Sequence, residues 1–253
     1  MKLGAQLYSV RNHLQTPEDI RATFLKLKEI GYENVQLSGN AQLPAEIFRD
    51  VSLESGLPIV CTHTPISRIL EETEQVIADH KTFNCPVVGL GVMPEKYHGS
   101  IEGLEKFLAE METPVKKILD AGLRFCYHNH AFELAPSTDS DLLVFDVMLE
   151  KCPTWDFIMD TYWIEFAGFS AIDYIAKIGK ERLTNIHFKD LANNEERGIC
   201  ACGTGTLDFQ KIYEACVKMD VKNVLVEQDT AALTPDPFAE MEKSFRHLRP
   251  IVH

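Results

Sequence analysis

The chain has 253 residues, of which 45% are hydrophobic, so it is long and apolar enough to bury a sizeable core. It carries 38 Asp and Glu residues against 25 Lys and Arg, and this formal net charge of −13 argues against a nucleic-acid partner, because such binding depends on cations that neutralise phosphates. We therefore expect a small-molecule substrate.

The start of the chain, MKLGAQLYSV, lacks the apolar stretch of a signal peptide, and no apolar run approaches the roughly 20 residues that a membrane span needs. The 7 cysteines are scattered and odd in number, which indicates reduced thiols rather than a disulfide framework. We expect a cytoplasmic protein with no membrane partner. A homo-oligomer is compatible with these features.

Short runs rich in Val, Ile and Leu alternate with segments of helical periodicity, and a glycine often stands between helix and strand as a helix C-cap would. Thr16 and Pro17 mark the first helix as its N-cap and first-turn proline. The predicted strands are 2–8, 33–37, 58–63, 86–92, 124–130, 156–160, 183–188 and 223–227. The predicted helices are 17–30, 43–55, 66–83, 101–121, 139–151, 170–179, 208–219 and 236–248.

These strand and helix units follow one another without a linker, which predicts one domain over residues 1–253. The fold class is α/β, and a single (β/α)8 TIM barrel is favoured over a doubly wound sheet. In such a barrel the chemistry lies at the carboxyl ends of the strands and in the loops that follow. The candidate side chains at these places are Gln6, His63, His128, His130, Glu133, Asp160, Trp163, His187, Lys189 and Glu227.

Asp160, His187 and Glu227 end three consecutive predicted strands, so closing the barrel should bring them to one region. A mixed set of imidazole and carboxylate ligands suits Mn²⁺, Co²⁺, Zn²⁺ or Fe²⁺ better than calcium. The alternative is that each is a buried polar residue paired with a neighbour. The pattern of three favours one divalent metal ion, whose identity is open.

The stretch FCYHNHAFEL, residues 125–134, places two histidines two positions apart. If the segment stays extended, His128 and His130 point into the barrel while Tyr127 and Asn129 turn toward the helices. His130 is then a candidate acid or base, with a supporting hydrogen bond as the alternative.

Lys189 follows His187 by two positions and should face the same interior, where its charge would stabilise an anion. A surface salt bridge with Asp190 is the alternative. The nearby stretch GTGTLDF, residues 203–209, lacks the third glycine of a dinucleotide site and follows a long loop rather than a first strand. It predicts a turn into a helix with Thr206 or Asp208 near the N-cap.

Four residues are candidates for contacts with the substrate. Trp163 offers an apolar face against which a sugar ring could stack. Gln6, His63 and Glu133 are the polar candidates, from the ends of strands 1 and 3 and the loop after strand 5.

The stretches QLYSVR, YHNHAFE, MDTYW, IHFKD, GTGTLDF and VLVEQD, in this order, resemble those of the xylose isomerase-like TIM barrels. That superfamily includes sugar phosphate isomerases/epimerases, inosose dehydratases, tagatose-type epimerases and endonuclease IV. In the epimerase branch the resemblance implies one divalent metal held by Glu, Asp, His and Glu from strands 5 to 8, and the two glutamates exchange the proton. Asp160, His187 and Glu227 match the last three positions. Strand 5 has no matching glutamate, and His128, or Glu133 in the loop, is the substitute.

The resemblance implies a metal-dependent isomerase or epimerase that acts on a ketose or sugar derivative through an enediolate. Glu227, His130 and Lys189 are then the candidate catalytic residues. The alternative is a lyase that eliminates water or another substituent from a keto-sugar or keto-inositol, which the missing glutamate favours. The endonuclease is disfavoured, because Trp163 stands where that protein implies a histidine and the net charge is negative. A non-catalytic binding barrel is a further alternative.

Overall fold

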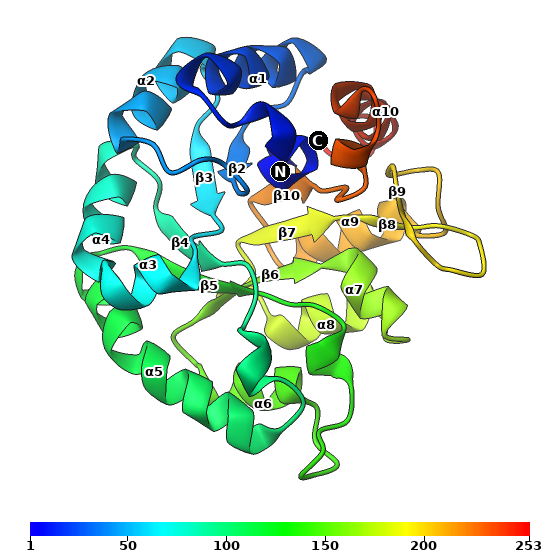
Figure 1. The fold of residues 1–253 in the computed structure, drawn as a ribbon. Coiled ribbons are helices and arrows are strands. Elements are labelled where there is room, and N and C mark those ends of the chain that lie inside the picture. The colour runs from blue at the N-terminus through cyan, green and yellow to red at the C-terminus, as the bar shows by residue number, and fades with distance from the viewer.

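A computed structural model describes residues 1–253 and confirms the (β/α)8 barrel. The barrel strands are β1 Lys2–Gln6, β2 Val35–Leu37, β3 Ile59–Thr62, β4 Val87–Leu90, β5 Arg124–His128, β6 Asp156–Asp160, β7 Asn185–Phe188 and β10 Asn223–Val226. They form one parallel sheet in the order β3-β2-β1-β10-β7-β6-β5-β4. A separate antiparallel pair, β8 Asp190–Leu191 and β9 Ile199–Cys200, follows β7 and projects to one side (Figure 1).

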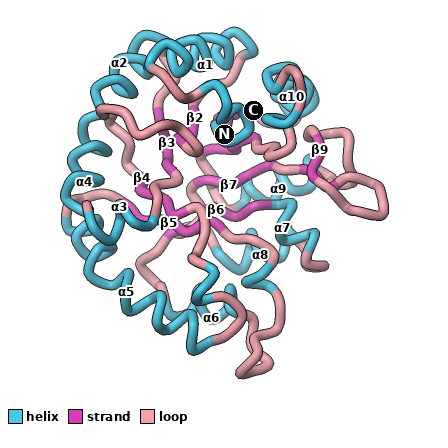
Figure 2. The backbone as a smooth tube through the Cα atoms, viewed as in Figure 1, coloured by secondary structure: helices cyan, strands magenta, loops and turns pink.

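The helices lie outside the strands (Figure 2). They are α1 Pro17–Ile30, α2 Ala45–Ser55, α3 Ile66–Glu71, α4 Thr73–Thr82, α5 Ile101–Asp120, α6 Val144–Lys151, α7 Thr161–Phe166, α8 Ala171–Ile178, α9 Phe209–Lys218 and α10 Pro237–Leu248. Short 3-10 helices cover Leu7–His13, Glu95–Tyr97, Phe132–Leu134 and Ala231–Leu233. No helix is both long and apolar enough to cross a membrane.

The barrel closes between β3 and β4, the two ends of the sheet. The backbone N–H of Thr64 donates to the carbonyl oxygen of Gly89 at 2.7 Å. A Cβ atom at Gly89 would lie 2.1 Å from the carbonyl oxygen of Thr62, so only glycine permits this approach.

The helix signals that the sequence carries are confirmed. Thr16 accepts a hydrogen bond from the backbone of Asp19, and Asp19 accepts one from the backbone of Thr16, which completes a capping box. Gly31 ends α1 with φ of 118°, a conformation that an L-residue with a side chain rarely adopts. Asp208 is the N-cap of α9.

Three predicted strands end two residues too late, and one of them, predicted at 86–92, ends at Leu90. The strand predicted at 2–8 ends at Gln6, because the side chain of Gln6 accepts a hydrogen bond from the backbone of Tyr8 and turns the chain into a 3-10 helix. The strand predicted at 124–130 pairs only as far as His128.

Two predicted helices also differ. The helix predicted at 66–83 is interrupted at Glu72, whose backbone leaves the helical region with φ −127° and ψ 34°. The helix predicted at 139–151 begins at Val144. The residues predicted as its first turn do not form a helix. Instead, the carboxylate of Asp139 accepts hydrogen bonds from the backbone N–H groups of Ile101 and Glu102 at the start of α5.

Candidate metal centre

Four buried side chains meet where adjacent barrel strands end. They are His128 on β5, Asp160 on β6, His187 on β7 and Glu227 directly after β10. One nitrogen or oxygen atom of each lies within 4.8 Å of the others. The residues at the ends of three consecutive strands thus lie together, and β5 adds a histidine to them.

The two histidines face the two carboxylates. The Nδ1 atom of His187 lies 2.9 Å from Oε2 of Glu227 and 3.8 Å from Oδ2 of Asp160. The Nε2 atom of His128 lies 3.3 Å from Oδ2 of Asp160 and 4.0 Å from Oε2 of Glu227. Two nitrogens and two oxygens therefore surround one small volume.

The opposite nitrogen of each ring faces an oxygen that only accepts hydrogen bonds. The Nδ1 atom of His128 lies 3.0 Å from the carbonyl oxygen of Gly91, and the Nε2 atom of His187 lies 2.6 Å from Oε1 of Gln36. Each neutral ring must carry its proton on that nitrogen. The lone pairs of His128 Nε2 and His187 Nδ1 are thereby left for the centre of the cluster.

These residues fit a divalent transition metal. His187 Nδ1 is buried and has no hydrogen-bond partner, although Oε2 of Glu227 lies 2.9 Å away. The carboxylate is close enough, but it is not in line with the ring nitrogen. In the neutral ring this nitrogen is a buried lone pair beside two carboxylates, which a cation would satisfy, and the mixed donor set suits Mn²⁺, Co²⁺, Zn²⁺ or Fe²⁺.

The electrostatics also favour a cation. Burial opposes ionisation of Asp160 and Glu227, but Lys189 and the histidines outweigh it and hold both pKa values below the usual range. Burial opposes the charge on His187 as well, but Glu227 and Asp160 raise its pKa to about 9. A buried site that retains a proton so firmly has excess negative charge.

Lys189 lies at the edge of this cluster and is almost fully buried. Its Nζ atom lies 2.8 Å from Oδ2 of Asp229 and 3.4 Å from one oxygen each of Asp160 and Glu227. Burial would lower its pKa, but these carboxylates raise the pKa above its usual value. Asp229 is not among the residues predicted from the sequence, although it follows Glu227 by two residues as Lys189 follows His187.

The surface salt bridge between Lys189 and Asp190 does not form. The buried Asp190 carboxylate instead accepts four backbone N–H bonds at 2.8 to 3.2 Å, from Leu191, Gly203, Gly205 and Leu207. A Cβ atom at Gly205 would lie 2.4 Å from Oδ1 of Asp190. The GTGTLDF stretch is therefore a loop wrapped around a carboxylate, and it leads into α9 as predicted.

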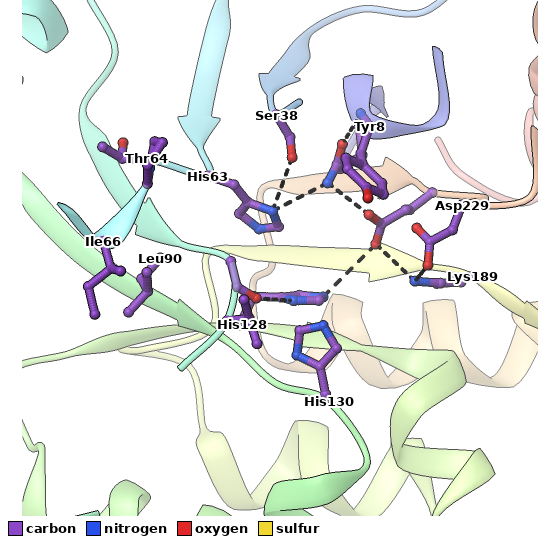
Figure 3. A pocket seen from close by; sticks show the side chains of 15 residues that line it. Tyr8, Ser38, His63, Thr64, Ile66, Leu90, His128, His130, Lys189 and Asp229 are labelled. Atoms are coloured by element: carbon purple, nitrogen blue, oxygen red, sulfur yellow. Dashed lines mark hydrogen bonds and ion pairs between the residues drawn. The ribbon is translucent and has the colours of Figure 1, made fainter. Parts of the chain in front are cut away.

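A cavity of about 400 Å³ opens above the cluster (Figure 3). Six of the predicted site residues line it, namely Gln6, His63, His128, His130, Lys189 and Glu227. Gln6 donates to Oε1 of Glu227 at 2.8 Å, which leaves Oε2 to face the cluster. Nδ1 of His63 lies 3.3 Å from the hydroxyl of Ser38, and its Nε2 is buried without a partner.

His130 lies in the cavity although the paired strand ends two residues earlier. Its ring stands edge-on to that of His128 with a centroid separation of 4.7 Å. Burial lowers the pKa of His130 to about 3, so the ring is neutral near pH 7. Its buried Nδ1 has no partner in the chain. A neutral ring of this kind offers one hydrogen bond to a ligand.

Glu133, predicted as a substrate contact, does not line the cavity. It is buried where the hydroxyl of Tyr127 donates to Oε1 and the backbone N–H of His130 donates to Oε2. Burial raises its pKa to about 8. Of the two substitutes for a strand-5 glutamate, His128 is the one that reaches the cluster.

Trp163 lies beside the cavity rather than in its lining. Its ring is 5.2 Å from that of His130, and the Nζ atom of Lys189 lies 5.0 Å from its centroid. Its indole nitrogen is buried without a partner. Its backbone N–H donates to Asp160 at the start of α7. Trp163 therefore packs against His130 and Lys189 without lining the cavity.

Comparison with known proteins identifies the fold. No model of a protein family matches the sequence, and no curated protein matches it. The structure is similar to a sugar phosphate isomerase/epimerase from Parabacteroides distasonis, with a TM-score of 0.80 and 21% identity over 100% of both chains. It is also similar to D-allulose 3-epimerase from Methylomonas sp., with a TM-score of 0.74 and 14% identity over 100% of this chain and 98% of that one.

A third similar structure is the probable 3-DHS dehydratase AsbF from Bacillus anthracis, with a TM-score of 0.71 and 13% identity over 98% of this chain and 99% of that one. The chain thus has the TIM-barrel fold of these structures, in agreement with the resemblance of its sequence motifs to xylose isomerase-like TIM barrels. Structures of this fold include epimerases and a dehydratase, so the fold alone does not select a reaction.

Proposed function

We propose that the chain is a metal-dependent isomerase or epimerase that moves the proton on a carbon next to the carbonyl of a ketose or sugar derivative. The observation that carries this proposal is the convergence of two imidazoles and two carboxylates below a cavity of about 400 Å³. That volume lies within the usual range for small-molecule sites. The fold shared with D-allulose 3-epimerase supports the same reaction class.

His128, Asp160, His187 and Glu227 would hold the ion. When bound, a divalent ion supplies Lewis acidity that stabilises negative charge on a substrate oxygen beside the carbon that loses its proton. The remaining work falls to the side chains of this chain.

Glu227 is the proposed base. Lys189, 3.4 Å from its Oε2, helps to keep Glu227 ionised inside the barrel, so the carboxylate is unprotonated near pH 7. Gln6 holds Oε1 of Glu227 at 2.8 Å and thereby sets the orientation of the carboxylate. The position at the cavity wall gives this carboxylate access to a substrate.

His130 and Lys189 contribute hydrogen bonds and charge. The low pKa of His130 favours a hydrogen bond from its neutral ring to a substrate oxygen over proton uptake. Lys189 places a fixed positive charge on the opposite side of the cavity from Ile66 and Leu90 (Figure 3). Both features stabilise negative charge that develops on the substrate during proton transfer.

A lyase reaction is the second candidate, and the residue on β5 favours it. His128 stands where the epimerase branch implies a glutamate, so Glu227 is the only glutamate of the metal cluster. Elimination needs one base and one group that assists departure of the leaving group, which Glu227 and a histidine can supply. The similarity to a probable 3-DHS dehydratase is compatible with this chemistry.

Deuterium exchange tests the proposal. The protein, loaded in turn with Mn²⁺, Co²⁺, Zn²⁺ and Fe²⁺, is incubated in D2O with a panel of ketoses and keto-sugar derivatives, and products are followed by NMR and mass spectrometry. An isomerase or epimerase gives an isomer of the substrate that carries deuterium in place of hydrogen at one carbon. A lyase gives a product that has lost water or an alcohol. Absence of both with every metal would contradict the proposal.

The matched variant is Glu227→Gln, which keeps the shape of the side chain and removes the base. We expect turnover to fall at least about 1,000-fold, since the base takes part in the reaction itself. Thermal unfolding of the same variant checks that the fold is retained.

A further inference from the structure

The cavity above the cluster has two chemically different sides. Figure 3 shows Lys189 and Asp229 on one side and Ile66 and Leu90 on the other. Pro65 and Val92, which lie next to Ile66 and two residues after Leu90 in the chain, also line the cavity. We refer to Pro65, Ile66, Leu90 and Val92 as the apolar wall.

The apolar wall is built into the site. Pro65 and Ile66 follow β3 at the start of α3, whereas Leu90 ends β4. Gly91, which stands between Leu90 and Val92, accepts the hydrogen bond from Nδ1 of His128. The backbone that orients a metal-site histidine therefore also positions the apolar wall.

Part of the apolar wall faces the open cavity. Leu90 is buried, but Val92 retains 46% of its exposed area at the mouth. A free sugar presents hydroxyl groups on most of its surface, and these would lose water against the wall without gaining a hydrogen bond. An apolar group on the substrate would instead gain from contact with the wall.

The charges around the cavity do not suit a phosphate. Lys189 is the only Lys or Arg in the lining, and Asp160, Glu227 and Asp229 already surround it. A bound divalent ion together with Lys189 would balance these three carboxylates. A phosphate dianion would therefore meet no unpaired cation in the lining and would lie near Asp229.

We propose that the cavity binds an uncharged sugar derivative that carries an apolar substituent, as an aryl glycoside does. The sugar ring lies over the cluster, and the substituent packs against the apolar wall. This inference rests on the proposed function for the place of the sugar ring. It adds the class of substrate, and it excludes sugar phosphates.

Paired ligands test the inference by calorimetry on the Mn²⁺-loaded protein. Phenyl and methyl glycosides of gluco, galacto, manno and allo configuration are compared with the corresponding sugar 6-phosphates. We expect at least one phenyl glycoside to bind roughly 10-fold more tightly than its methyl partner, because the ring removes apolar surface from water. The inference is wrong if no pair shows the preference, if none of the glycosides binds, or if a phosphate binds more tightly than its glycosides.

Variants locate the phenyl group. Ile66→Ser and Val92→Ser should each reduce the ratio of phenyl to methyl affinity at least about threefold. Leu53→Ser is the matched control, because Leu53 on α2 is 76% exposed and lies outside the cavity lining. The control should keep the full ratio. A ratio that survives in both wall variants would place the phenyl group elsewhere and overturn the inference.

The two proposals fail in different ways. If the reaction is wrong but the apolar wall acts as inferred, the phenyl preference persists although no keto sugar exchanges deuterium. If the inference alone is wrong, deuterium exchange proceeds, but phenyl and methyl derivatives bind equally well.

Discussion

The Nε2 atom of His187 on β7 lies 2.6 Å from Oε1 of Gln36 on β2, on the far side of β1 and β10 in the sheet. Gln36 thereby determines which nitrogen of His187 faces Asp160 and Glu227. We expect Gln36→Met to lower the affinity for Mn²⁺ roughly 10- to 100-fold, because the ring loses the partner that holds its tautomer. Calorimetric titration with Mn²⁺ measures the change.

Gln36→Glu is the comparison variant, since it retains an oxygen acceptor at the same place. Its affinity for Mn²⁺ should stay closer to that of the unaltered protein than the affinity of Gln36→Met. Equal affinities for Gln36→Met and the unaltered protein would show that this hydrogen bond does not position His187.

The fourth position of the cluster can be tested with two variants. His128→Ala should lower the affinity for Mn²⁺ roughly 10- to 100-fold, because it removes a nitrogen that faces Asp160. Glu133→Gln should leave the affinity within about twofold, because Glu133 binds Tyr127 and lies outside the cavity. Calorimetry decides between them. The reverse pattern would show that the loop glutamate completes the site.

Lys189 balances three carboxylates inside the barrel, so its loss should destabilise the metal-free protein. Lys189→Met leaves Asp160 and Glu227 with the protonated His187 as their one remaining buried cation and should lower the free energy of unfolding by about 3 to 5 kcal/mol. Mn²⁺ should restore part of this loss. Urea unfolding with and without Mn²⁺ measures both effects.

The matched control for Lys189→Met is Lys106→Met, which removes an exposed pair with Glu102. It should change the free energy of unfolding by less than about 0.5 kcal/mol and show no dependence on Mn²⁺. A Lys189→Met protein as stable as this control would mean that the carboxylates do not need the lysine.

The buried His80 should make the folded protein less stable in mild acid. It is buried on α4, with Nδ1 2.7 Å from the carbonyl oxygen of Val76 and Nε2 3.0 Å from the hydroxyl of Thr62. Burial lowers its pKa from 6.5 to about 4. The unfolded chain therefore binds the proton first as the pH falls below 6.5, and stability that is present above 6.5 is lost toward pH 4.

Between pH 7 and pH 5 the loss in the free energy of unfolding that is due to His80 is about 2 kcal/mol. His80→Gln keeps a donor and an acceptor but does not titrate. Between pH 7 and pH 5 the free energy of unfolding of this variant should therefore fall by about 2 kcal/mol less than that of the unaltered protein. Urea unfolding of both proteins at the two pH values gives the difference. Parallel losses in the two proteins would show that His80 is not the group responsible.

Asp190 should be a structural residue of the loop beside the site. Asp190→Asn replaces one acceptor oxygen with an NH2 group that faces backbone N–H donors, including those of Gly203 and Gly205. We expect a loss of about 2 to 4 kcal/mol in the free energy of unfolding. Asp120→Asn, which alters only an exposed pair with Lys116, is the control and should be nearly neutral. Similar stabilities of the two variants would contradict this role.

The barrel and three members of the cluster were predictable from the sequence alone. Apolar strands, helix signals such as Thr16 and the glycines between helix and strand are local patterns, and each depends on neighbours a few residues away. Once the barrel is predicted, polar residues at the ends of consecutive strands must meet at one mouth, which places Asp160, His187 and Glu227 together.

The turn after β5 was decided by tertiary structure. Glu133 is only five residues from His128, but the 3-10 helix Phe132–Leu134 carries it toward Tyr127 and away from the cluster. The hydrogen bond from the hydroxyl of Tyr127, and not the alternation of side chains along the strand, determines where this buried carboxylate lies. Sequence spacing alone left both candidates open.

The partners that complete the site were also decided by tertiary structure. Gln36 meets His187 across 151 positions of the chain, and Asp229 meets Lys189 across 40. Both pairs need side chains of matching length and orientation after the barrel has closed. Local periodicity shows which face of a strand a residue occupies, but the register and curvature of the closed sheet decide which atoms touch.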